Sequence, residues 1–144
     1  MTQAAVRRSR TAARRLKTPA TTHQADAARS ALGRHRSAVL SYLFKLNKCI
    51  DARHADLVHA VAARFSETLI DYVSFGHFRL FQTWPPEDHH LAAIENSTNQ
   101  ALGFSDRFTN PGIDLAALRK ELESLALALE VRFEIEDEVV GTTA

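Results

Sequence analysis

Residues 115–140 read LAALRKELESLALALEVRFEIEDEVV, and their apolar pattern decides the fold class. Five leucines alternate spacings of three and four: Leu115, Leu118, Leu122, Leu125 and Leu129. Such alternation puts them on one stripe of a long α-helix, as in the seam of a helical bundle. Val131, Phe133 and Ile135 alternate with charges as a strand would, but no Gly or Pro separates them from the leucines. We therefore expect a single helix that continues through this stretch.

The same stripe passes from apolar to charged residues toward its end. Steps of three and four beyond Leu129 reach Arg132, Glu136 and Val139. Arg132 and Glu136 are four residues apart and can form an ion pair on the helix. Charged groups are stable on an inward-facing stripe only when they are paired. We predict a structural polar network of Arg132, Glu136 and Asp137.

Two amphipathic segments precede residue 76. The first begins near Ala25 and is interrupted by LNKCID, residues 46–51. Asp51 is a good N-cap for the second, and Gly76 is expected to end or kink that helix. The second segment carries one stripe: Leu57, Val61, Phe65, Thr68 and Tyr72.

A third helix is expected between two sets of turn signals. TWPPED (residues 83–88) precedes it, and NPG (residues 110–112) follows it. Its predicted inner side comprises Leu91, Ile94, Thr98, Leu102 and Phe108. Asp114 can then cap the fourth helix. Four amphipathic helices with short joins predict an all-α protein, an antiparallel up-down four-helix bundle with a disordered N-terminal tail.

The N-terminal segment differs from the rest in charge. Six of the 18 Lys and Arg residues lie in the first 17 positions, and the first acid is Asp26. The remaining residues hold 12 bases against 17 acids. We expect residues 1–22 to be a disordered basic tail and residues 23–144 to be the bundle. Two further interpretations of the tail stay open: a mitochondrial transit peptide, and weak nucleic-acid contact by residues 7–17.

Composition excludes several classes of protein. Cys49 is the single cysteine, so no disulfide forms within one chain, and this usage fits a reducing compartment such as the cytoplasm. No apolar run approaches the roughly 20 residues of a membrane span. The N-terminus has no apolar core of a signal peptide. We therefore expect a cytoplasmic protein without membrane contact.

Residues 69–81, LIDYVSFGHFRLF, form the most apolar window and yet contain Asp71, Gly76 and His77. In an up-down bundle the carboxyl ends of the second and fourth helices meet. We therefore expect Asp71 and His77 to approach Arg132 and its acidic neighbours. A buried polar network is the simplest interpretation.

Three functional interpretations compete with it. A metal site could use His77, Asp71, Glu136 and Glu67, although the Glu-x-x-His motif of di-metal bundles is absent. Acid–base catalysis could use Asp71 with His77, but the sequence offers neither an oriented nucleophile nor a phosphate-binding glycine loop. The third is a binding surface on which Asp71 faces a basic partner, with Tyr72, Phe75 and Phe78 as aromatic anchors.

Two windows favour the binding surface. ETLIDYVSFGHFRLF (residues 67–81) and LEVRFEIEDEVV (residues 129–140) resemble the Rsd/AlgQ family, regulators of the primary sigma factor (sigma-70) of bacterial RNA polymerase. The D-Y-x-S-x-G-H-F and L-E-x-R-F-x-x-E-D cores are intact and in the family's order. The similarity runs from about Ala25 to Val140, although Ala31 stands where members carry a Trp.

The resemblance implies a non-enzymatic anti-sigma factor without cofactor or metal. It implies binding to the basic, −35-reading C-terminal region of the sigma factor, which limits its use by RNA polymerase. Asp71 matches a position that the family uses against sigma. The predicted partner-binding residues are Asp71, Tyr72, Ser74, Phe75, His77 and Phe78. The alternatives are a bundle that binds a different regulatory protein, and nucleic-acid contact through the tail.

Overall fold

The structure of this chain is a computed structural model that describes residues 18–141. The described residues are helical and contain no strand. Their elements are α2 (Thr18–Asp51), α3 (Ala55–Phe75), the π-helical turn η1 (Gly76–Leu80), α4 (Phe81–Thr83), the 3-10 turn η2 (Asp88–His90), α5 (Leu91–Phe108) and α6 (Leu115–Gly141). The prediction of an all-α four-helix bundle is confirmed.

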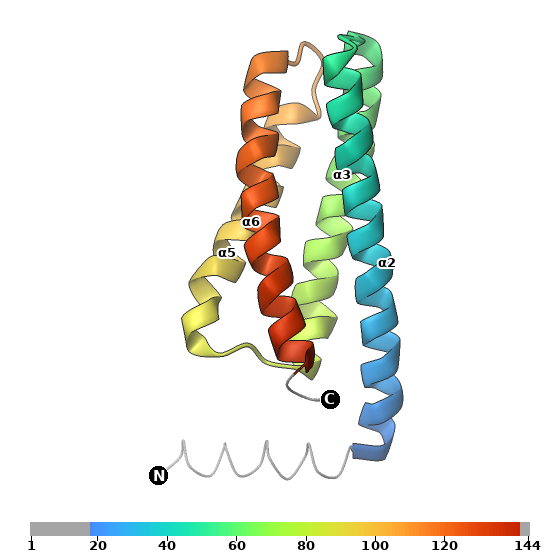
Figure 1. The fold of residues 1–144 in the computed structure, drawn as a ribbon, viewed down its shortest axis with the longest axis vertical. Coiled ribbons are helices and arrows are strands. Elements are labelled where there is room, and N and C mark those ends of the chain that lie inside the picture. Colours follow the sequence, from blue (N-terminus) through green and yellow to red (C-terminus); the bar gives the residue numbers. More distant parts are fainter. Residues whose placement is uncertain (1–17, 142–144) are drawn as a thin grey trace.

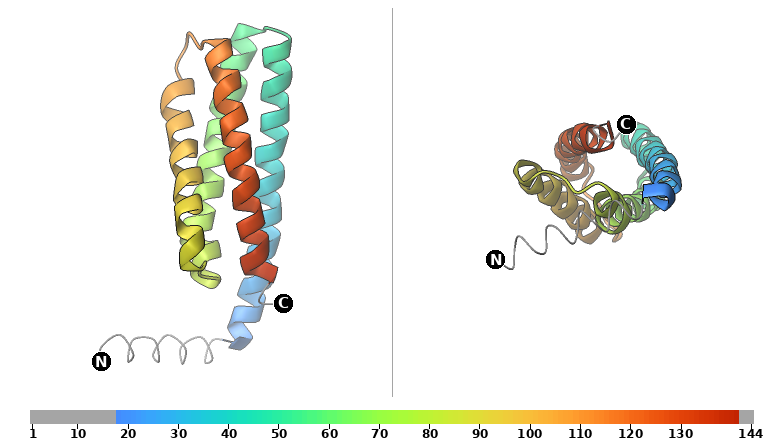
Figure 2. Two further views of the ribbon diagram at one scale, coloured as in Figure 1. Left: turned by 60° about the vertical axis from the view of Figure 1, so that its left-hand side comes forward. Right: turned by 90° about the horizontal axis from the view of Figure 1, so that it is seen from below.

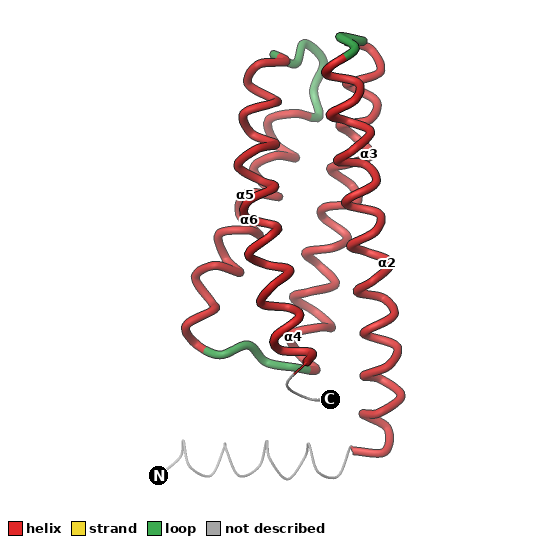
Figure 3. Tube along the Cα trace, in the orientation of Figure 1, coloured by secondary structure: helices red, strands yellow, loops and turns green. Residues whose placement is uncertain are grey.

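The long helices run up and down in the order α2, α3, α5, α6 around a shared core. Figure 1 looks onto the layer formed by α2 and α6, with α3 and α5 behind it. α2 packs most extensively on α3 and more sparingly on α6. The first turns of α2 extend past the end of the bundle (Figures 1 and 2). The loops that join α2 to α3 and α5 to α6 lie at one end of the bundle, and the loop that joins α4 to η2 lies at the other (Figure 3).

Two boundaries differ from the sequence predictions. α2 begins at Thr18, so residues 18–22 belong to a helix rather than to the tail. Pro19 suits a first helical turn, where no backbone N–H is required. α2 also continues through residues 46–51, and α3 starts after His54, so Asp51 is not its N-cap. The predictions for the tail before residue 18 lie outside the described residues, including nucleic-acid contact by residues 7–17.

The chain reverses between α2 and α3 at Arg53, which has a positive φ of 56°. Its left-handed backbone ends α2, a role that sequence patterns rarely assign to arginine. Asp51 instead forms an ion pair with Arg119 of α6. At the α5–α6 junction the predicted turn and cap are confirmed: Gly112 has a φ of 83°, and Asp114 Oδ1 accepts a hydrogen bond from Ala116 N at 3.0 Å.

The predicted stripe of α6 is confirmed. Its buried residues include Leu118, Leu122, Leu125, Leu129, Arg132, Glu136 and Val139. The predicted inner side of α5 is right in part: Phe108 is buried and Ile94 and Thr98 are half-buried, but the two leucines are not inside. Leu91 and Leu102 are 49% and 46% exposed, and the buried positions are Ser97, Ala101, Phe104 and Phe108. On α3, Leu57 is likewise exposed. No described helix is long and apolar enough to cross a membrane.

Candidate functional site

A buried polar network joins α3 to α6. Tyr72 is fully buried, and its hydroxyl donates a hydrogen bond to Glu136 Oε2 at 2.5 Å. Arg132 Nε donates to the same oxygen at 3.2 Å. Arg132 and Glu136 are 1% and 0% exposed, so each charge depends on the other for compensation. Burial raises the pKa of Tyr72, and the Glu136 charge adds to this, so the hydroxyl stays neutral and acts as the donor.

The guanidinium of Arg132 reaches across the core to α5. Its Nη1 donates to Thr98 Oγ1 at 2.9 Å and to Ser97 Oγ at 3.1 Å. It also lies over the rings of Tyr72 and Phe81, at 5.2 and 5.6 Å from their centroids. These contacts explain why small polar residues, rather than leucines, occupy the inner side of α5 at this level.

Arg36 completes the network from α2. Its side chain donates to Glu136 Oε1 at 3.0 and 3.1 Å, to Asp137 Oδ1 at 2.8 Å and to the backbone oxygen of Phe133 at 2.9 Å. The acids raise the pKa of Arg36 against the opposing effect of burial. The predicted network of Arg132, Glu136 and Asp137 therefore exists, with Asp137 attached through Arg36. No motif on α2 distinguishes Arg36 from its neighbouring bases, so the sequence did not reveal it.

Asp71 and His77 do not join this network, contrary to the prediction. Both are exposed. Asp71 and Tyr72 are adjacent on one helix, where successive side chains point about 100° apart, so burial of Tyr72 turns Asp71 outward. Glu136 instead takes its partners from α2, α3 and its own helix.

The six predicted partner-binding residues divide into two groups. Tyr72 and Phe75 are 0% and 6% exposed, so they are core residues and not surface anchors. The other four reach the surface: Asp71, His77 and Phe78 are exposed, and Ser74 is half-buried. Phe78 is 70% exposed, the highest value among the exposed large apolar side chains of the described residues. The His77 ring stands edge-on to it at 4.7 Å.

The surface beside Asp71 includes residues of α2. His35 stacks on Phe75 at 4.8 Å, and Arg79 lies over Phe75 at 5.7 Å. Burial lowers the pKa of His35, the Asp71 carboxylate opposes this, and Arg34 and Arg79 add to the lowering. Asp71 therefore stands among positive groups, although residues 18–144 hold more acids than bases. His35 and Arg34 were missed because only the fold brings α2 to Asp71, whereas Arg79 lies in the same window and was not singled out.

The π-helical turn η1 begins at Gly76 and carries the exposed residues His77 and Phe78. A π turn holds one more residue than an α turn, so residues after Gly76 are rotated relative to a continuous helix. The prediction that Gly76 ends or kinks the helix is confirmed, since α3 ends at Phe75. Such turns occur frequently at functional sites.

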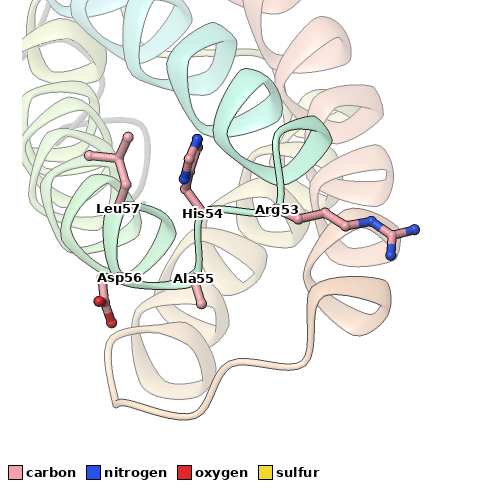
Figure 4. A pocket seen from close by; sticks show the side chains of 5 residues that line it. All are labelled: Arg53, His54, Ala55, Asp56 and Leu57. Carbon is pink, nitrogen blue, oxygen red and sulfur yellow. The ribbon is translucent and has the colours of Figure 1, made fainter.

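Other candidate sites are less convincing. Among residues 18–141, no three His, Cys, Asp or Glu side chains are grouped so as to hold a metal ion. The metal set we considered is divided, because Glu136 is buried while Asp71, His77 and Glu67 are exposed. A shallow hollow lies at the α2–α3 turn, lined by residues 53–57 (Figure 4). The side chain of Arg53 points away from that of His54 there, and no predicted site residue takes part.

Comparison with known proteins supplies the relatives of this chain. Residues 20–143 match the family described as "Regulator of RNA polymerase sigma(70) subunit, Rsd/AlgQ". A protein named "Regulator of sigma D" from Yersinia enterocolitica is 28% identical over 107 residues, covering 64% of each chain. One of the same name from Pectobacterium atrosepticum is 32% identical over 91 residues, covering 53% of this chain and 60% of the relative. The match thus spans less than two thirds of these relatives' length. No solved structure matches this chain.

Proposed function

We propose that this chain, which belongs to the Rsd/AlgQ family of regulators of the RNA polymerase sigma(70) subunit, binds the primary sigma factor through its C-terminal, −35-reading region. By holding that region it limits the use of the sigma factor by RNA polymerase. The chain acts by binding and not by catalysis, in the cytoplasm, where the polymerase works. The binding residues are Asp71, Ser74, His77 and Phe78.

One observation carries this proposal: the four motif residues that reach the surface are contiguous along α3 and η1, and they include the most exposed large apolar side chain. An exposed phenylalanine without a structural role is unfavourable in water, whereas aromatic side chains are common anchors at interfaces. The π turn holds Phe78 at the surface while its neighbours in the motif, Tyr72 and Phe75, fill the core.

The polar groups around Phe78 suit a partner that carries a base. The Asp71 carboxylate is exposed and can accept a charge-assisted hydrogen bond from an arginine or lysine. Arg34 and Arg79 stand nearby, so a partner with an acid next to that base fits better than a uniformly basic one. This arrangement favours a particular docking orientation and discriminates against simple polyanions and polycations.

Calorimetric titration tests the proposal. The full chain is titrated with the intact primary sigma factor and, separately, with its isolated C-terminal region. We expect similar affinities, since the proposed contacts lie within that region. Binding to intact sigma alone would refute the assignment to the C-terminal region, and no binding to either would refute the function.

A further inference from the structure

We propose that α2 and α6 together form a self-complementary surface through which two copies of this chain pair around a two-fold axis. This surface is separate from the proposed sigma-binding residues, which lie on α3 and η1 behind the α2–α6 layer (Figure 1). The inference therefore goes beyond the proposed function and does not depend on it.

The surface is built from one stripe on each helix. On α2, residues four apart follow Arg36: Leu40, Phe44 and Lys48. On α6, residues spaced by four and three follow Arg119: Glu123, Leu127 and Glu130. Arg36 contacts Asp137 of α6, and Arg119 contacts Asp51 of α2, so both stripes start at the α2–α6 junction. Each step of four residues turns by about 40° around a helix, so the later residues of both stripes rotate from the junction toward the outer face of the α2–α6 layer.

Large apolar side chains on both stripes are open to solvent. Leu40, Phe44 and Leu127 are 49%, 62% and 66% exposed. They come from two adjacent helices that are far apart in sequence. An apolar group assembled in this way, with charged residues around it, is typical of an interaction surface.

The charges around the apolar residues are of both signs and are separated by helix. Lys48 lies over the Phe44 ring at 5.1 Å on α2, while Glu123 and Glu130 are exposed on α6. None of these three forms an ion pair within the described residues. The surface thus has a basic side and an acidic side, each with its own apolar group.

The two sides are also in register. The ion pairs Arg36–Asp137 and Asp51–Arg119 fix α2 and α6 as antiparallel neighbours. Because every α-helical residue advances by the same rise, counting between these pairs places Phe44 level with Leu127 and Lys48 level with Glu123.

Because of this register, a second copy of the chain fits the α2–α6 surface. A two-fold axis parallel to the helices keeps each residue at its own height and places α2 of one copy against α6 of the other. Phe44 then meets Leu127 of the second copy, and Lys48 meets Glu123, twice in each dimer. The surface is small for a permanent dimer, so we expect a weak, concentration-dependent association.

Sedimentation velocity of the full chain over a concentration series tests this inference. We expect conversion from monomer to dimer as concentration rises, and loss of the dimer in Leu127→Ser. Leu102→Ser is the matched control, because Leu102 is a comparably exposed leucine on α5, behind the layer. A chain that stays monomeric throughout would overturn the proposal, as would equal effects of the two substitutions.

Charge reversal tests the pairing itself. Lys48→Glu or Glu123→Lys alone should weaken the dimer by about tenfold or more, and the double variant should recover it. Double variants no better than the single ones would contradict the register. Carbodiimide cross-linking of mixed isotope-labelled and unlabelled chains should join Lys48 to Glu123 between copies. Links between Lys48 and Glu123 that occur only within one copy would overturn the proposal.

Discussion

The guanidinium of Arg132 occupies the place where a side chain at Gly76 would begin. A Cβ atom at position 76 would overlap Nη2 of Arg132. The φ of Gly76 is −57°, which any residue adopts, so the left-handed geometry that glycine usually supplies is not the reason for it. Gly76 is needed so that a buried cation can approach the backbone at the start of the π turn.

Gly76→Ala should therefore lower the free energy of unfolding by about 1–3 kcal/mol. Arg132 could move only by leaving its partners on α5 and α6. Gly33→Ala on α2 is the control, because nothing lies within 4 Å of its Cβ position. That change should be neutral or stabilising by up to about 1 kcal/mol. Urea unfolding measures both, and equal effects would refute the role of close approach.

Removing either arginine should reveal their different contributions to the network. Arg132→Met leaves the Glu136 carboxylate buried without its partner on α6 and should cost about 3–5 kcal/mol. Arg36→Met should cost less, because the Arg36 side chain is 20% exposed and water can replace part of its contact. Chemical denaturation of the two variants gives the comparison. A larger loss for Arg36→Met would show that the α2 contact dominates the network.

The sequence predicted the parts of this fold where pattern and burial agree. The α6 stripe is regular over many turns, so its ionic extension to Arg132 and Glu136 could be found by counting. On α5 the counting found Phe108 but missed Ser97, which contacts Arg132, and Ala101, while Leu91 and Leu102 face solvent. Hydrophobicity favours leucine inside, and small residues enter the core only where a neighbour fills the space.

The sequence located the stretch of residues that contains the candidate site, but it did not show which of their side chains reach the surface. Residues 67–81 were identified from the motif, yet their division into core and surface depends on the helix rotation. That rotation is set by Tyr72 meeting Glu136 and by the π turn. Arg36 and His35 lie on α2, far from this window in sequence, and no local spacing singles them out.

The pH dependence of stability should include a contribution from His35. Burial lowers its pKa in the folded state below the ordinary value of 6.5. The unfolded chain therefore binds this proton first as pH falls, so stability decreases below about pH 6.5 and levels off below the folded pKa. His35→Gln should flatten this part of the profile in thermal unfolding from neutral to mildly acidic pH. An unchanged profile would show that other groups cause the loss.

Phe78→Ala should leave stability within about 0.5 kcal/mol of the parent chain, because a 70% exposed ring contributes little to the core. Phe65→Ala is the contrasting variant. Its ring is fully buried and packs edge-on against Phe104 at 5.2 Å, so the loss should be about 3–5 kcal/mol. A large loss of stability in Phe78→Ala would show that this ring is structural.

The central claim is that Asp71 and Phe78 form a partner-binding surface. The most direct measurement is a binding titration of the C-terminal region of the primary sigma factor with Asp71→Asn, Phe78→Ala and the parent chain, all shown to be folded by circular dichroism. Asp106→Asn and Leu102→Ala, which change exposed residues of α5, are the matched controls. We predict losses of more than about 1 kcal/mol for the first two and none for the controls. Parent-like affinity of folded Asp71→Asn and Phe78→Ala would contradict the account.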